Sequence, residues 1–363
     1  MIESGARLKS RLARNGLRFG VGADALTEAF REKVGGRRFA RYLRLAEAFS
    51  SGAASASEFY GIVGDAEEAA LFQSFQAPLV AAVGRRLYEA AVAPLPAGGR
   101  LVELGAWHGA LADAFAAMRP DVDVVAVERE ARVARAGRSR FRRPNLSIVR
   151  GSYAAPPRAA RDADAVVSCL GVDFAFGEPP HPLQGGSIRG APIHAETTRE
   201  AAPLFDAARK VSKTDAVLAV GLRAPNRGRA LAIVDAAAAA GFAFVPRKSD
   251  VLVVGGATIF FGVFRRGKSA GPEEMKEDAF LRFWRSRRPP PKARRGTFVG
   301  EDALCAYEAL SARRTVSEVV VELAPDLPAR VETGRARGVS YVFTQAEDGV
   351  HELKVRKDRA AAR

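Results

Sequence analysis

The segment that decides the fold is VELGAWHG at residues 102–109. It follows an expected strand, Leu101–Leu104, and opens an expected helix, Ala110–Met118, which is where a glycine-rich loop can meet a ligand. Gly105 permits a tight turn off the strand, and Gly109 lets the next helix pack closely or the backbone approach a ligand. The N–H groups at the start of such a helix are suited to bind a carboxylate.

Short apolar runs alternate with helical patterns on the carboxyl side of this loop, which predicts a parallel sheet covered by helices on both faces. The further expected strands are Val124–Val127, Leu146–Val149, Ala165–Leu170, Val217–Val220, Phe242–Val245 (from which an apolar run continues toward Val254) and Thr258–Phe264. The helices expected between them are Glu130–Gly137, Thr198–Val211 and Arg229–Ala240. The sequence therefore predicts an α/β fold for this region.

Glu128 ends the second expected strand, 23 residues after Gly105. An acidic side chain at this position can accept hydrogen bonds from both hydroxyl groups of a ribose. The alternative is that the glycines serve only the turn and the packing, but an acid in register with them favours a ligand site.

VELGAWHG followed by VVAVE resembles the first two motifs of class I S-adenosylmethionine-dependent methyltransferases, over about 170 residues. The resemblance implies a Rossmann-like, seven-stranded, mostly parallel sheet, whose final strand runs antiparallel and inserts next to the fifth. It implies S-adenosyl-L-methionine as the cofactor, with Glu128 binding its ribose. The other cofactor-binding residues that we expect are Glu103, Gly105, Ala106, Trp107, Gly109, Ser152 and Leu170.

Two positions depart from the family pattern. Trp107 stands where such families often have a third glycine, and its indole could stack against the ligand or fill the ligand's space. Ser152 follows the third strand, where the family often has an acid that contacts adenine. A nicotinamide dehydrogenase is the competing interpretation, but it requires the glycine order G-x-G-x-x-G, which residues 105–109 do not supply.

The residues after the fourth expected strand are candidates for acceptor binding. Residues 174–195 form a long segment rich in proline and glycine, which we expect to be a substrate lid. Asp173, His181 and His194 are candidate general bases, although a lone loop histidine is more often a solvated surface residue. Methyl transfer can also proceed by proximity alone. Cys169 could be a nucleophile, but the end of an apolar strand favours a small core residue.

The chain divides into four expected regions. Residues 1–95 form a helical N-terminal segment, 96–266 the methyltransferase domain, 267–296 a basic, Pro-rich linker and 297–363 a small α+β C-terminal module. In the first region we expect a helix at Arg37–Phe49, a loop at Ser50–Ser57 and one helix that carries Phe72, Phe75, Leu79, Val83 and Leu87. In the last we expect a helix at Glu301–Leu310 and strands at Val316–Leu323, Ala329–Thr333, Ser340–Phe343 and His351–Val355.

Composition bounds the class of protein. The 363 residues are 48% hydrophobic and 27% charged, as in ordinary globular proteins. Two distant cysteines and four histidines favour neither a disulfide framework nor a metal site. No segment is apolar for long enough to span a bilayer, and the start lacks the apolar stretch of a secretory signal. We therefore expect a cytoplasmic protein that does not bind membranes.

The leading hypothesis is methyl transfer from S-adenosylmethionine to oxygen or nitrogen of an unidentified acceptor, with a small molecule expected first. One alternative is a catalytically inactive scaffold, motivated by Trp107 and Ser152. The other is a nucleic-acid-modifying methyltransferase that binds RNA or DNA, motivated by the net charge of +15. The densest run of arginines, at 129–143, is also consistent with a solvated helix face. The C-terminal module would serve homodimer formation, partner binding or a lid.

Overall fold

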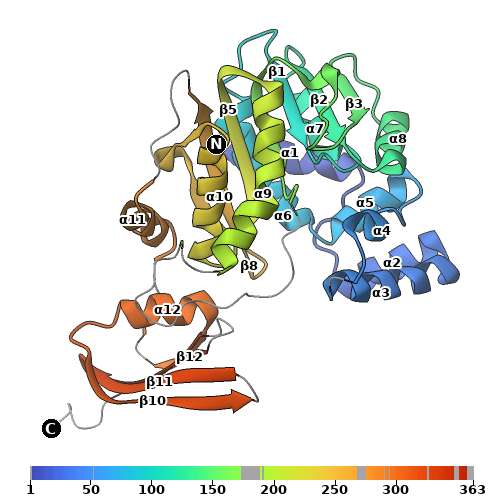
Figure 1. The fold of residues 1–363 in the computed structure, drawn as a ribbon. Helices are drawn as coiled ribbons and strands as arrows, with labels where there is room; N and C mark the ends of the chain where they lie inside the picture. The colour runs from blue at the N-terminus through green and yellow to red at the C-terminus, as the bar shows by residue number, and fades with distance from the viewer. Residues whose placement is uncertain are drawn as a thin grey trace. The chain divides into compact units, whose positions relative to one another are not determined.

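The computed structural model describes residues 2–51, 53–172, 189, 192–267, 275–289, 291–293, 295–324, 327–346 and 351–357 (Figure 1). Contacts divide the chain into two compact units. Unit 1 comprises residues 1–176, 200–223 and 236–274, and unit 2 comprises 177–199, 224–235 and 275–363. The expected lid residues 174–188, together with Asp173 and His181, lie outside the described residues.

Unit 1 contains the Rossmann-like sheet, in the order β3-β2-β1-β4-β5-β8-β6, with β7 paired to β8. Its first five strands are parallel, and β8 runs antiparallel between β5 and β6, as the family resemblance implies. The strands are β1 Arg100–Leu104, β2 Asp123–Glu128, β3 Leu146–Arg150, β4 Ala163–Cys169, β5 Ser212–Arg223, β6 Phe242–Phe244, β7 Asp250–Val254 and β8 Ala257–Arg266. A turn at Pro246–Lys248 splits the apolar run after Phe242 in two, so the sheet has eight strands instead of the expected seven.

Helices cover both faces of this sheet because the strands are apolar on both sides. α1 (Ile2–Arg14), α6 (Ala77–Leu87) and α7 (Ala110–Met118) share one buried core with β1, β2 and β4. On the other face, α9 (Pro192–Val211) places Phe205 against Phe264 of β8, with ring centroids 5.6 Å apart. Figure 1 shows α9 in front of the strands. The remaining helices that follow strands are α8 (Ala131–Arg140) and α10 (Arg227–Ala239).

The N-terminal helices pack around aromatic side chains. They are α2 (Ala23–Val34), α3 (Gly36–Ser50), α4 (Ala56–Tyr60) and α5 (Ala66–Ser74). Phe30 is fully buried against Tyr42 and Phe72, with ring centroids 5.2 and 6.0 Å away. The single helix expected through Phe72 and Leu87 is wrong: α5 ends at Ser74 and α6 begins at Ala77. Pro78 in the first turn of α6 explains the break, because proline lacks the N–H that a continuous helix requires.

α4 begins inside the segment 50–57 that the sequence predicts to be a loop. Ser55 accepts a hydrogen bond from the Glu58 backbone N–H, and the Glu58 carboxylate accepts one from the Ser55 N–H. This reciprocal capping box satisfies two backbone donors that a short helix would otherwise leave open. The cap therefore starts a helix where composition alone indicates a loop.

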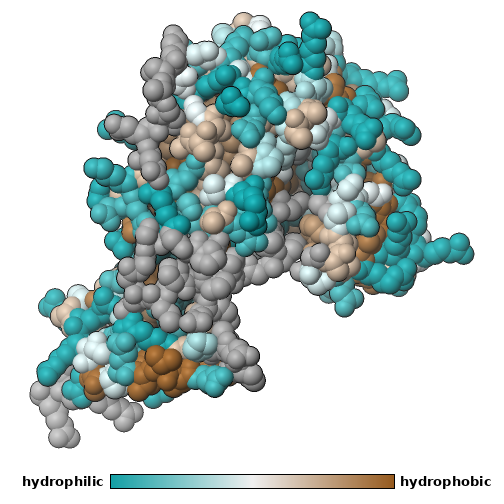
Figure 2. All heavy atoms as spheres, in the orientation of Figure 1, coloured by the Kyte–Doolittle hydropathy of each residue, from teal (hydrophilic) through white to brown (hydrophobic). Residues whose placement is uncertain are grey.

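Unit 2 contains the antiparallel C-terminal sheet, in the order β10-β11-β12-β13-β9. Its strands are β9 Gly296–Val299, β10 Arg314–Ala324, β11 Leu327–Ala336, β12 Val339–Ala346 and β13 His351–Lys357. α12 (Gly300–Glu308) covers one face and stacks Tyr307 on Phe343 at 4.0 Å. The expected antiparallel sheet with one helix is confirmed. Figure 2 shows an apolar patch on this unit, where Val319 is 51% and Leu323 53% exposed.

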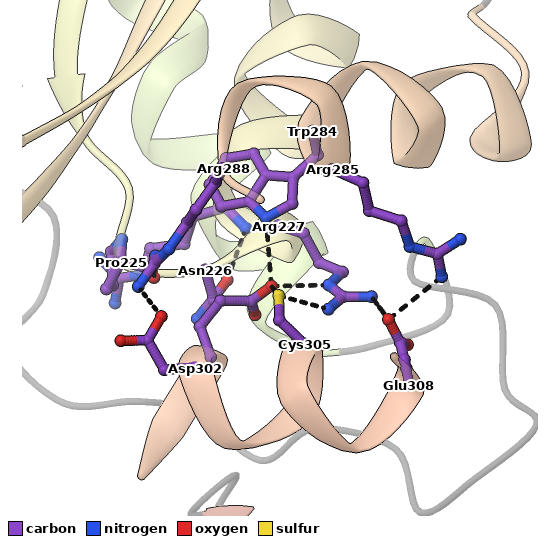
Figure 3. Close-up of polar contacts among 11 residues, drawn as sticks. Pro225, Asn226, Arg227, Trp284, Arg285, Arg288, Asp302, Cys305 and Glu308 are labelled. Atoms are coloured by element: carbon purple, nitrogen blue, oxygen red, sulfur yellow. Dashed lines mark hydrogen bonds and ion pairs between the residues drawn. The ribbon is translucent and has the colours of Figure 1, made fainter. Parts of the chain in front are cut away.

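α11 (Glu277–Arg287) is a helix that the sequence analysis did not predict, because it lies in the segment assigned to a linker. It buries Phe280 and Trp284 completely. Trp284 Nε1 donates to the carboxylate of Glu301 at 3.1 Å, and the same oxygen accepts from Arg227 Nε at 2.8 Å (Figure 3). Arg227, at the start of α10, also donates to Glu308 at 2.9 Å, so one buried guanidinium connects α10 with both ends of α12.

The close packing of β5 on α6 can be tested by a substitution. A Cβ at Gly221 would lie 2.2 Å from Val83 Cγ1, so Gly221→Ala should lower the free energy of unfolding by about 1–3 kcal/mol through overpacking. Chemical denaturation measures this. Gly36→Ala, where a Cβ would meet no atom within 4 Å, is the matched control. Equal effects of the two substitutions would contradict the packing.

Candidate functional site

The candidate site lies at the carboxyl ends of β1 and β4, where the strand order of the sheet reverses. Residues 105–109 leave β1 there, and Leu170 and Gly171 leave β4. Two non-glycine residues at this edge have left-handed backbones, Trp107 with φ 52° and Leu170 with φ 55°. Such conformations cost about 1–3 kcal/mol each and concentrate at functional sites, which supports a ligand-binding role for this edge.

The two glycines of the loop serve different purposes. Gly105 has φ 73°, and a Cβ there would lie 2.6 Å from the hydroxyl of Tyr153, on the crevice side of the loop. Gly109 has φ 84°, and a Cβ there would lie 2.7 Å from Ile148 Cδ1, on the core side. Gly105 therefore leaves room for the Tyr153 hydroxyl beside the loop, whereas Gly109 permits the packing of α7.

Glu128 closes the loop from the end of β2. Its two carboxylate oxygens accept hydrogen bonds from the backbone N–H groups of Trp107 and Glu130, at 2.9 and 2.8 Å. The side chain is only 6% exposed, and burial raises the pKa of Glu128 to about 7, although these two hydrogen bonds act in the opposite direction. A carboxylate has about four acceptor positions, so acceptor capacity remains for ligand hydroxyls.

Glu103 lies beneath the loop, where it caps α7. Its carboxyl accepts a hydrogen bond from the backbone N–H of Ala112, in the first turn of that helix. It is 2% exposed, and Oε2 has no hydrogen-bond partner among the described residues. Burial raises the pKa of Glu103 to about 8. The helix N-terminus that sequence reasoning reserved for a ligand carboxylate is thus contacted by the protein's own carboxyl group.

Two further loop amides are directed toward β2. The N–H groups of Gly105 and Ala106 both donate to the carbonyl of Val127, each at 3.0 Å. Ala106 is 3% exposed, so its backbone and not its side chain shapes the site. These bonds attach the start of the loop to the end of β2.

Trp107 is anchored by the N-terminal helices. Its Nε1 donates to the carbonyl of Ala69 at 3.0 Å, and its ring centroid lies 5.4 Å from those of Tyr60 and Phe72. The two roles considered from sequence, stacking on the ligand or filling its space, stay predictions. The indole joins the aromatic core of α4 and α5.

Tyr153 lies at the candidate site, although the sequence did not indicate it. Its hydroxyl donates to the carbonyl of Gly171 at 2.5 Å, and a Cβ at Gly171 would lie 2.6 Å from it. The phenol therefore extends from the end of β3 across the glycines that follow β1 and β4. Ser152, the predicted neighbour, instead accepts a hydrogen bond from Ala155 N–H at 3.2 Å. The only sequence signal was the glycine after Leu170, which leaves space for the ring.

The remaining polar groups near the loop are poorly suited to acid–base or nucleophilic chemistry. His108 is fully buried, neither ring nitrogen has a partner among the described residues, and burial lowers its pKa to about 3. Burial and the nearby Glu103 raise the pKa of Cys169 well above its usual value, so it stays a thiol at neutral pH. This agrees with the interpretation of Cys169 as a core residue.

His194 is the predicted general base that the structure describes. It lies near the start of α9, in unit 2, and its Nε2 is 2.9 Å from Asp235 Oδ2. Asp235 also accepts two hydrogen bonds from Arg189, at 2.7 and 2.8 Å. His194 is 8% exposed, so it is not the solvated loop residue that a lone histidine usually is. Its role as a base stays a prediction.

Within the described ranges, no three histidine, cysteine, aspartate or glutamate residues are grouped as metal ligands. Nor does that part of the chain contain a helix long and apolar enough to cross a membrane.

Solved methyltransferase structures are similar to part of this chain. A TehB-like SAM-dependent methyltransferase from Corynebacterium glutamicum is 14% identical over 50% of this chain and 86% of its own, with a TM-score of 0.34. The 16S rRNA (adenine(1408)-N(1))-methyltransferase from Catenulisporales acidiphilia is 17% identical over 50% and 93%, with a TM-score of 0.33. A methyltransferase from Pyrococcus furiosus is 16% identical over 51% and 83%, with a TM-score of 0.35. Neither a protein-family model nor a curated protein sequence matches the chain.

The buried carboxyl of Glu103 predicts a pH-dependent effect of Glu103→Gln. A pKa near 8 in the folded state means that the stabilisation from protonated Glu103 is complete below about pH 4.5 and is lost as the pH rises toward 8. Glutamine cannot ionise, so the stability of the variant relative to the parent should rise over this window, by at most about 1.4 kcal/mol per pH unit.

Urea denaturation at pH 5 and pH 8 measures this difference. The exposed Glu32→Gln is the matched control, for which the difference should not change with pH. A constant difference for Glu103→Gln would contradict a protonated carboxyl at this position.

Proposed function

We propose that the chain binds S-adenosylmethionine at the carboxyl ends of β1, β2 and β4 and transfers its methyl group to oxygen or nitrogen of an acceptor. The observation that carries the proposal is the pairing of Glu128 with the loop that begins at Gly105, at the reversal point of a sheet with an antiparallel β8. The motif resemblance assigns ribose binding to this acid and the methionine end to this loop.

The residues present fit such a cofactor. Glu128 is a buried carboxyl with acceptor capacity left, and the φ of 73° at Gly105 is a backbone conformation that glycine adopts readily. Two ribose hydroxyls that donate to Glu128 would offset the burial of its charge. Leu170 directly follows β4, at the edge of the sheet where the proposal places the transferred methyl group.

S-adenosylmethionine, when bound, supplies a methyl group on a positively charged sulfur, which a lone pair of the acceptor attacks while the carbon–sulfur electron pair leaves to the sulfur. The protein's own contribution is orientation and exclusion of water. The Tyr153 phenol lies at the same edge and would contact a ligand there. The acceptor proton can leave to solvent, so the proposal requires no base among the described residues.

A catalytically inactive scaffold is the second candidate. It is favoured by the Tyr153 hydroxyl, which lies across the glycines that would contact the cofactor. Cofactor affinity distinguishes the two candidates, because an inactive scaffold of this kind binds the cofactor weakly or not at all.

Isothermal titration with S-adenosylhomocysteine tests the proposal. We expect the intact chain to bind, and Glu128→Ala to weaken binding by about 10-fold or more, because each hydrogen bond to a charged group contributes about 1.5–3 kcal/mol. Glu130→Ala is the matched control. It removes a carboxylate two residues from Glu128 but leaves the backbone N–H of residue 130, which donates a hydrogen bond to Glu128. No binding by the intact chain would overturn the proposal and favour the scaffold.

The same titration should depend on pH. The pKa of Glu128 is about 7 without ligand, and hydroxyl donors bind its ionised form best, so the affinity should rise as the pH increases from 6 to 8. Titrations at both values, on the parent and on Glu103→Gln, separate Glu128 from the second buried carboxyl. A pH-independent affinity would count against Glu128 as the ribose acceptor.

A further inference from the structure

Arginines from two distant parts of the chain meet in unit 1. α1 carries Arg7, Arg11 and Arg14, and the end of α8 is followed by Arg143. The guanidinium of Arg140 lies against the end of α1, since a Cβ at Gly16 would be 2.9 Å from its Nη2. We call the set Arg7, Arg11, Arg14, Arg140 and Arg143 the α1–α8 arginine cluster.

Asp113 of α7 ties these elements together. Its carboxylate accepts hydrogen bonds from Arg143 Nε at 2.5 Å and from Asn15 Nδ2 at 3.0 Å, which joins α1, α7 and the segment after α8. Figure 1 shows α1 beside α7. The aspartate is 2% exposed, and as a single carboxylate it can offset only one of the guanidinium charges around it.

The cluster carries uncompensated positive charge. Arg7, Arg11, Arg14 and Arg140 form no ion pair with a described residue, whereas Arg143 pairs with Asp113. Five guanidinium groups less one carboxylate leave an excess charge of +4. Burial first, then Arg14, Arg143 and Arg7, lower the pKa of Arg11, whereas Asp113 raises it, as expected for guanidinium groups that lie close together.

The geometry favours a polyanion over a single small anion. Arg7, Arg11 and Arg14 follow one helix face at spacings of four and three residues, which spans roughly 10 Å of the α1 axis. Guanidinium groups bind phosphates in a planar, bidentate manner. One phosphate cannot contact both ends of such a row, but consecutive phosphates of a nucleic acid can.

The cluster also acts on the loop of the candidate site. After burial, Arg140 is the second cause that lowers the pKa of His108, which lies in the loop 105–109. The His108 ring centroid is 5.8 Å from that of Phe141, next to Arg140 in sequence. Arg140 is thus next in sequence to a residue that packs on this loop.

We propose that the α1–α8 arginine cluster binds the phosphate backbone of a nucleic acid. This goes beyond methyl transfer, because the binding needs no cofactor and can be measured without turnover. Single-stranded RNA and duplex DNA carry the same phosphate chemistry, and the experiment distinguishes them.

Fluorescence anisotropy of a labelled 20-nucleotide RNA, and of a DNA duplex of the same sequence, measures the binding at several salt concentrations. We expect the full chain to bind one of them with an affinity that falls steeply with salt. The double variant Arg14→Glu, Arg140→Glu should weaken binding by about 10-fold or more and reduce the slope of log Kd against log salt by about two, one for each lost contact.

The matched control is Arg41→Glu, Arg44→Glu, which makes the same charge change at exposed positions of α3. An equal loss in both double variants would overturn the proposal, since binding would then follow net charge alone, and so would the absence of binding by the parent. Thermal melting confirms that each variant folds, and Arg14→Gln, Arg140→Gln replaces the cluster variant if it does not. Titration with S-adenosylhomocysteine is run separately, so failure of cofactor binding and failure of nucleic-acid binding are distinguishable.

Discussion

The contact on which the site depends is the closure of the loop after β1 onto the end of β2. Val127 accepts two backbone hydrogen bonds from this loop, and the Glu128 carboxylate accepts a third. Because these acceptors belong to the neighbouring strand, contacts with β2 hold the loop in place. The left-handed backbone at Trp107 is held in the same way, between Glu128 on one side and Ala69 on the other.

Burial then sets the electrostatics of this edge. Glu103 and Glu128 are carboxyls in a low-dielectric environment, whose pKa values rise to about 8 and about 7. Each is partly compensated by backbone donors, because a buried charge without partners would cost several kcal/mol. Near pH 7.5 Glu103 is therefore mostly protonated, whereas Glu128 is mostly ionised, so the two carboxyls differ in charge.

Much of this arrangement could be predicted from sequence because it depends on local patterns. Apolar runs located the strands, and Gly105 and Glu128 lie at the ends of β1 and β2 as expected. Three features could not be predicted, because they depend on residues far apart in sequence. The Tyr153 ring is placed by Gly171, the Trp107 indole by Ala69, and Arg140 by the end of α1. The break before α6 was different: Pro78 carried the signal, and the helical spacing of the apolar residues obscured it.

The contacts of the Arg227 guanidinium restrict where the chain can be truncated. A truncated product that ends at residue 266 would keep Arg227 within α10 but lose Glu301 and Glu308, both of its carboxylate partners. Trp284, which shares Glu301 with it, would be lost as well. Such a product would expose a cation that is 5% exposed in the full chain, together with the apolar surface around it. Domain-swap or deletion experiments should therefore use junctions that keep Arg227, Glu301 and Glu308 in the same product. Otherwise they should replace Arg227 with an apolar residue of similar volume.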